Sequence, residues 1–183
     1  MGEASVKTGR DIAEIGGDVS VPAFVEPELC TLVDEPPSGR DWFHEPKIDG
    51  YRLLARKEGD RVQLFTRSGL DWTARFPSVA QSIARLAPKT LLVDGEVAVL
   101  NEMGTSSFHA LQRALADDDD NASVVFFAFD LLLAEGVDLR QRTLEERKRA
   151  LALVLADVDD PSLQYVKHDD GEPFEDFGLD GVA

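Results

Sequence analysis

The sequence predicts one domain of the α+β class, in which hairpin-connected strands form the sheet and helices pack against it. Two apolar runs, 90–100 and 123–133, indicate buried strands. Glycine-containing turn signals between shorter segments indicate hairpins. Segments 77–87, 108–116 and 143–155 carry apolar residues at helical spacing. The 183 residues, 43% of them hydrophobic, suffice for a domain with a sizeable core.

Composition excludes several classes of protein. The single cysteine, Cys30, excludes an internal disulfide and a cysteine-based zinc site. No apolar run reaches membrane-spanning length, and the N-terminus has no signal-peptide core. We therefore expect a soluble, cytoplasmic protein with no membrane partner. The formal net charge of −16 is unfavourable for duplex binding, although the arginines of segment 52–75 offer a local basic face.

The N-terminal part has little periodicity. Residues 1–21 are rich in glycine, serine and charge, and we predict a disordered leader there. Segment 22–40 is rich in proline and should be extended, with Phe24 and Leu32 packing along the domain.

The stretch 45–52, which reads EPKIDGYR, carries the clearest functional signal. Apolar residues on both sides predict a strand, a tight turn at Asp49-Gly50 and a second strand. An ordinary hairpin needs neither Lys47 nor Arg52. Together they suit nucleophilic attack by an amine, because desolvation or a nearby cation lowers the pKa of a lysine and frees its lone pair. The alternative is an exposed hairpin in which the lysine pairs with a flanking carboxylate.

The segments that follow read as regular elements. Segments 51–57 and 61–66 predict a hairpin around residues 58–60. A loop at 66–69 comes next, and then a helix over 77–87 with a proline in its first turn.

The apolar run 90–100 is interrupted by Asp94-Gly95-Glu96. Charges inside an apolar strand cost stability unless they are paired or bind something. A glycine in a strand also marks a bulge or a close backbone approach. The alternative is a hairpin turn with solvated acids, but the agreement of the two signals favours a functional role for Glu96.

The last third of the chain predicts further elements. The acidic run 117–121 reads as a solvated loop rather than a metal site. In the strand 123–133, Phe127 and Phe129 should point to the same face. Thr143 and the glutamate three residues later fit a capping box that opens the helix ending near residue 155, and 162–167 predicts a short strand.

The stretch 45–52 resembles motif I of the covalent nucleotidyltransferases, in the form found in ATP-dependent DNA ligases. The flanking sequence is similar to the ligase domains of bacterial multi-domain end-joining ligases. Segments 66–70, 94–96 and 129–131 resemble motifs Ia, III and IIIa, in the family's order. The resemblance implies the family's adenylation-domain (ATP-grasp-like) fold, with antiparallel sheets flanked by helices.

The resemblance also implies a reaction. In this family the motif I lysine attacks the α-phosphate of ATP, pyrophosphate leaves and a lysyl-AMP forms. Lys47 would be that nucleophile, with ATP as substrate and Mg²⁺ or Mn²⁺ as the metal. The implied binding residues are Glu45 and Phe129 for adenine, Arg52 for the ribose or phosphate side, Glu96 for ribose or metal, and Arg67 for a DNA phosphate.

The C-terminal residues 178–183 resemble the start of motif IV, with Asp180 in place of a metal-binding glutamate. Motif V and an OB-fold domain do not follow within the 183 residues. From these two observations we expect residues 22–183 to be a partial adenylation domain. We also expect this chain alone to form lysyl-AMP slowly and to seal no nicks.

The expected function is that of an ATP-dependent DNA ligase in DNA repair and recombination. It would act on nicked double-stranded DNA, with other end-joining proteins as candidate partners. Two alternatives remain open. One is an RNA ligase or capping-type nucleotidyltransferase, which share the Lys-x-Asp-Gly core. The other is a non-catalytic remnant that binds nucleotide or is inert.

Overall fold

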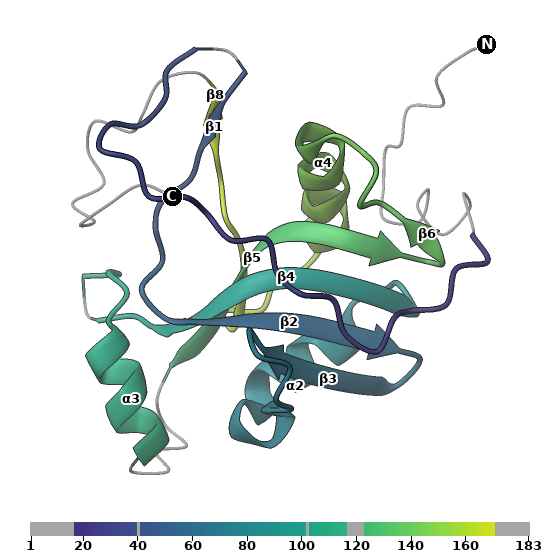
Figure 1. Cartoon of the computed structure of the whole chain (residues 1–183). Coiled ribbons are helices and arrows are strands. Elements are labelled where there is room, and N and C mark those ends of the chain that lie inside the picture. The colour runs from purple at the N-terminus through teal and green to yellow at the C-terminus, as the bar shows by residue number, and fades with distance from the viewer. Residues whose placement is uncertain (1–16, 40, 102, 117–122, 171–183) are drawn as a thin grey trace.

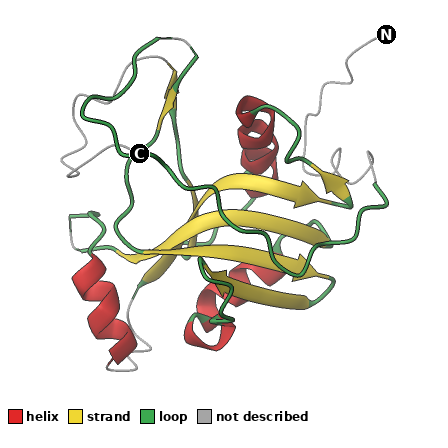
Figure 2. Cartoon of the chain, in the orientation of Figure 1, coloured by secondary structure: helices red, strands yellow, loops and turns green. Residues whose placement is uncertain are grey.

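A six-stranded sheet forms the centre of the chain (Figures 1 and 2). The computed structural model describes residues 17–39, 41–101, 103–116 and 123–170. The strand order is β3-β2-β4-β5-β6, and β7 pairs with β5. The strands are β2 (Tyr51–Glu58), β3 (Arg61–Thr66), β4 (Thr90–Val99), β5 (Val124–Ala134), β6 (Val137–Asp138) and β7 (Leu163–Tyr165).

The strands of this sheet are antiparallel, with one exception. β2 pairs with β3 and β4, and β5 pairs with β4 and β6, all in antiparallel register. Only β7 runs parallel to its neighbour β5. Parallel neighbours need a crossover connection, and the helix α4 (Leu144–Leu155) supplies it on the way from β5 to β7.

One face of the sheet is covered by helices α2 (Pro77–Arg85) and α4. The core on this face joins strand residues such as Leu53 and Phe126 to Ile83 of α2 and Leu151 of α4. Helix α3 (Phe108–Ala116) lies at one end of the sheet and adds its buried Leu111 to the same core (Figure 1). A short 3₁₀ turn, η1 (Thr73–Arg75), precedes α2. All three predicted helices are confirmed.

The other face is crossed by the N-terminal segment, drawn in purple and dark blue in Figure 1. Val21 is buried against Leu54 and two further leucines of β4 and β5. The Phe24 ring meets Phe65 edge-on, with 6.0 Å between centroids. Arg56, itself buried, donates hydrogen bonds to the backbone carbonyls of residues 21 and 22. This face is therefore also part of the core.

Residues 17–21 differ from the predicted leader. The amides of Gly17 and Val19 donate to the carbonyls of Glu135 and Gly136 at 3.0 Å, which ties the segment to the β5–β6 turn. Packing therefore begins upstream of residue 22, because backbone hydrogen bonds and contact with leucines of the sheet compensate for the weak local signal. Residues 1–16 lie outside the described residues. Leu32, expected to pack, is 97% exposed.

The motif I stretch is not a hairpin, which corrects the prediction. The strand before it, β1 (Phe43–His44), pairs with β8 (Asp169–Asp170) instead of β2. Gly50 is required because there is no room for a Cβ atom, and not because the backbone adopts a turn conformation. A Cβ atom at this position would lie 2.1 Å from the carbonyl oxygen of Val97. The chain thus leaves the small β1–β8 sheet after His44 and enters the large sheet where β2 begins, at Tyr51.

Among the helices of the described ranges, none combines the length and the apolar character that a bilayer crossing requires.

Candidate active site

One cavity of about 440 Å³ lies where the two sheets meet. Its walls come from the motif I stretch and from strands β2, β4 and β5. Residues 30–33 and Val166 complete them. All five residues predicted for a nucleotide site line this cavity: Glu45, Lys47, Arg52, Glu96 and Phe129. The volume is within the usual range for small-molecule sites.

Glu96 of β4 holds the motif I stretch in place. Its Oε1 accepts a hydrogen bond of 2.9 Å from the backbone amide of Gly50. Burial raises the pKa of Glu96, while that hydrogen bond and the charges of Lys47 and Arg52 act in the opposite direction. The carboxylate is thus placed in the cavity wall beside the predicted nucleophile.

Asp49 fastens the same stretch from the other side. Its amide donates to Ser106 Oγ at 3.0 Å, and its Oδ2 accepts from the backbone amide of Phe108 at 3.3 Å. Phe108 is the first residue of α3, so Asp49 satisfies one of the free amides at that helix start. The Tyr51 ring also lies 5.0 Å from the Phe108 ring. Motif I is therefore fixed to β4 and to α3 at once.

Lys47 lies two residues before Asp49, at the N-terminal side of these anchored positions. It lines the cavity and its side chain is exposed. No ion pair within the described ranges involves Lys47. The alternative prediction was that Lys47 pairs with a flanking carboxylate. The ion pairs of those ranges do not include such a pair. An exposed amine at a cavity wall is accessible to a bound electrophile.

Arg52 forms the next part of the wall. Its Nε and Nη2 donate to the two carboxylate oxygens of Asp94 at 3.1 and 2.8 Å. Burial raises the pKa of Asp94, and the bidentate pair with Arg52 counteracts that rise. The guanidinium carbon also lies 5.2 Å from the centre of the Phe129 ring, a cation–π distance. Arg52 is thus oriented by a buried carboxylate and an aromatic ring.

Phe129 lies at an irregularity of β5. The register of β4 against β5 passes from Asp94↔Asp130 to Gly95↔Ala128, so Phe129 has no partner on β4. Gly95 allows the close approach there, since a Cβ would lie 2.4 Å from the Phe126 ring. The bulge predicted from this glycine is confirmed. Phe127 and Phe129 belong to one apolar cluster, as their parity predicted.

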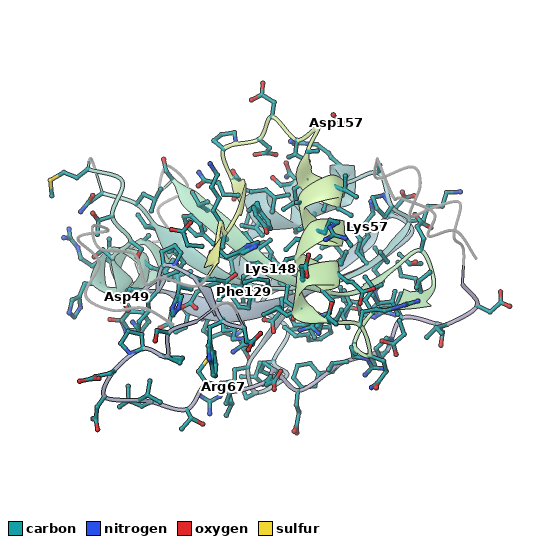
Figure 3. The ribbon with its side chains drawn as sticks, turned by 90° about the horizontal axis from the view of Figure 1, so that it is seen from above. Asp49, Lys57, Arg67, Phe129, Lys148 and Asp157 are labelled. Carbon is teal, nitrogen blue, oxygen red and sulfur yellow. The ribbon has the colours of Figure 1, made fainter. Side chains whose placement is uncertain are left out.

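Lys148 of α4 was not predicted as a site residue. It is 1% exposed, and its Nζ donates to Glu45 Oε1 and to the carbonyl oxygens of Phe129 (3.1 Å) and Val166 (3.2 Å). Burial lowers its pKa to about 8. The sequence did contain a signal, because Lys148 lies in the middle of the apolar stripe of its helix, between Leu144 and Leu151. Figure 3 labels Lys148 beside Phe129.

Of the predicted residues that the structure describes, one lies apart from the cavity. Arg67 is exposed in the loop after β3 and does not line it; Figure 3 labels it apart from Phe129. Its contact with a DNA phosphate stays a prediction. Asp180 lies outside the described residues, as do residues 117–121.

A model of the family described as ATP dependent DNA ligase domain matches residues 28–177. The chain belongs to this family of ATP-dependent DNA ligase domains. The multifunctional non-homologous end joining protein LigD of Pseudomonas aeruginosa is 39% identical over 166 residues, which are 90% of this chain and 20% of that protein. DNA ligase C2 of Mycolicibacterium smegmatis is 32% identical and covers 90% of this chain and 50% of its own length. The chain therefore spans between a fifth and a half of these curated relatives.

Solved structures of the same family resemble this one. The ligase domain of LigD from M. tuberculosis matches with a TM-score of 0.59 and 30% identity, over 70% of this chain and 42% of that one. A mycobacterial DNA ligase D complexed with ATP and MES matches with a TM-score of 0.58 and 31% identity, over 74% of this chain and 43% of that one. These matches confirm the predicted fold class and the ligase family.

Proposed function

We propose that the cavity binds ATP and that Lys47 becomes adenylated, as the first step of DNA strand joining. The observation that carries this proposal is the convergence of five predicted residues. They come from motif I, β2, β4 and β5, which are far apart in the sequence, and they line one cavity of about 440 Å³. A structural relative that is 31% identical was solved with ATP.

In the proposed step the Lys47 amine attacks the α-phosphorus of ATP. A phosphorus–nitrogen bond forms, the bond from the α-phosphorus to the bridging oxygen breaks, and pyrophosphate leaves. The amine loses a proton in the process. Phosphoryl transfer depends on positioning and charge stabilisation more than on covalent help from the protein. Anchoring of motif I by Glu96 and Asp49 supplies the positioning, and the guanidinium of Arg52 supplies a fixed positive charge.

Phe129 and Glu45 are the proposed adenine contacts. The Arg52 guanidinium covers one face of the Phe129 ring, so a base that stacks on this ring uses the opposite face. Glu45 Oε1 accepts from Lys148. The other oxygen, Oε2, is proposed to accept a hydrogen bond from the 6-amino group of adenine.

The residues of the cavity are compatible with a metal that enters with ATP. The described ranges contain no group of three or more His, Cys, Asp or Glu side chains arranged for a metal ion. Mg²⁺ needs no such group, because it often takes one or two carboxylates and the phosphates of its nucleotide. Glu96 is the proposed protein ligand, together with Asp180. When bound, the metal would offset the negative charge of the phosphates.

Strand joining is proposed from the family, whose relatives named above are longer than this chain. Their names refer to end joining and to DNA ligase, and nicked duplex DNA is the proposed partner here. The polypeptide of these 183 residues has a net charge of −16, so we expect weak, salt-sensitive DNA binding. We expect it to form lysyl-AMP slowly and to give no detectable sealing of nicks.

The proposal is tested by incubating the chain with α-labelled ATP and Mg²⁺ or Mn²⁺, followed by denaturing electrophoresis and mass spectrometry. We expect label on Lys47 that acid releases as AMP, and none in a Lys47→Ala variant. Labelled GTP serves as the comparison, because preferential labelling by GTP would favour a capping-type enzyme. A wild-type chain that neither binds ATP nor takes up label would contradict the proposal.

A further inference from the structure

Lys148 connects three separate walls of the cavity from behind. Its acceptors are a side chain of the motif I stretch (Glu45), a carbonyl of β5 (Phe129) and a carbonyl after β7 (Val166). Each of these three residues lines the cavity, whereas Lys148 does not. An ammonium group has three N–H donors, and here each of them has an acceptor in a different wall.

Fold stability alone does not require a buried ion pair at this position, although removing Lys148 by itself would leave its three acceptors without a donor. Replacing a buried ion pair by well-packed apolar residues is often neutral or stabilising. Leu151, one turn further along the helix, is apolar and fully buried. A methionine or leucine would satisfy such packing. The charge therefore has a role other than filling the space between α4 and β5.

We propose that Lys148 is a positioning residue for nucleotide selection: it holds the Glu45 carboxylate in one orientation and so makes the cavity selective for adenine over guanine. The inference rests on the function proposed above. An ionised carboxylate only accepts hydrogen bonds. The 6-amino group of adenine donates one to it, whereas the 6-oxo group of guanine would face it as a second acceptor.

The same contacts link the carboxylate to the aromatic part of the site. Lys148 fixes the backbone carbonyl of Phe129, which carries the ring proposed to stack on the base. Its Nζ also lies 5.1 Å from the centre of the Tyr165 ring, a cation–π distance. One ammonium thus sets the relative position of the proposed hydrogen-bonding group and the stacking group.

The test compares Lys148→Met, Glu45→Gln and the double variant with wild type. Calorimetry gives the affinities for ATP and GTP at pH 7, and urea unfolding gives the stability. We expect Lys148→Met to reduce the ATP-to-GTP preference by about 10- to 100-fold, the range for losing a hydrogen bond to a charged group. If Lys148 acts through Glu45, the double variant should be no less selective than the poorer single variant.

Lys57→Met is the matched control. Lys57 is also a buried lysine, 4% exposed, and its Nζ donates to the carbonyls of Ala84 and Leu86 at the end of α2, away from the cavity. We expect it to lose stability and to keep the wild-type preference for ATP. An unchanged preference in Lys148→Met, alongside a selective wild type, would overturn the inference and leave the proposed function standing. A wild type that binds neither nucleotide would overturn both.

Discussion

Two glycines of the site are required by the space around them. Gly50 and Gly95 both lie outside the left-handed backbone region, so the lack of a Cβ is what matters. At each of them a Cβ would meet backbone or ring atoms of a neighbouring strand closer than 3 Å. Close strand contact is therefore what brings the motif I stretch and Phe129 into one cavity.

Adding a Cβ atom at Gly50 tests whether this close strand contact is required. We expect Gly50→Ala to destabilise the chain by about 1–3 kcal/mol, the usual cost of overpacking, and to weaken ATP binding because Lys47 moves with the backbone. Gly59→Ala is the control. Gly59 has a φ of +59°, but no atom lies within 4 Å of the point that a Cβ would occupy, so this change should cost only about 1 kcal/mol and leave binding unchanged. Urea unfolding and calorimetry measure both, and equal effects on binding would contradict the argument.

The Arg52–Asp94 pair predicts a pH dependence. The pKa of Asp94 is raised by burial, so its stabilising contribution is present at low pH and is lost as the pH rises through its folded-state pKa. Removing the arginine raises this pKa further. We expect Arg52→Met to be nearly as stable as wild type near pH 4 and less stable by about 3 kcal/mol at pH 7, where a buried carboxylate is left without its partner.

Urea unfolding at several pH values measures this difference. The control is Arg140→Met, which removes an arginine from a largely exposed pair with Asp138 and should change stability little. A deficit of Arg52→Met that stays constant between pH 4 and pH 7 would show that the charge of Asp94 is not its cause.

At the scale of elements, α4 is the support of the cavity wall. It carries Lys148 on its buried side, and its start is fixed by a capping box. The Thr143 side chain accepts from the amide of Glu146, and the Glu146 side chain accepts from the amide of Thr143. The sequence predicted this box because the two residue types occur at the required spacing.

Removal of the cap should weaken the whole helix. We expect Thr143→Ala to reduce the free energy of unfolding by about 1 kcal/mol, and Thr143→Ser to retain most of it because the hydroxyl remains. Since Thr143 is exposed and does not line the cavity, ATP affinity should not change at temperatures where both variants are fully folded. Chemical unfolding of the two variants measures the effect, and equal losses in both would exclude the hydroxyl as its source.

The elements also show which features a single sequence can predict. Helices α2, α3 and α4 and the long strands follow from local periodicity, and they appear where the pattern placed them. The partner of β1 does not follow, because β8 lies at the other end of the described chain and only the folded molecule brings them together. Lys148 was missed for a similar reason. Its role depends on Glu45, which is about a hundred residues away in the sequence.

At the scale of the whole molecule, the N-terminal segment joins the sheet to the cavity. Residues 17–25 cover one sheet face, and the chain continues to 30–33, which line the cavity. Arg56 holds this path through the carbonyls of Val21 and Pro22. One continuous segment thus protects the core and completes a wall of the site.

Two truncations test this arrangement. Deleting residues 1–25 removes Val21, Phe24 and the acceptors of Arg56. We expect a clear fall in the thermal unfolding midpoint with exposure of apolar surface, because the leucines that β2, β4 and β5 present to this segment lose their cover. Deleting residues 1–16 is the comparison, because it retains the contacts of Gly17, Val19 and Val21, and its midpoint should stay closer to that of the full chain. Thermal unfolding with a hydrophobic dye distinguishes the two, and equal midpoints would contradict a structural role for 17–25.

The pairing of β1 with β8 has a consequence for the order of events during synthesis. The hairpin β2–β3 and the pairing with β4 use neighbouring parts of the chain and are available early, whereas β1 must wait for β8. Contacts between distant segments form slowly because loop closure has to precede them. A nascent chain that stops short of residue 170 would hold most of the large sheet and an unfinished cavity. Lys47 would thus be synthesised early, while the Val166 part of the cavity wall and the pairing of β1 with β8 would come last.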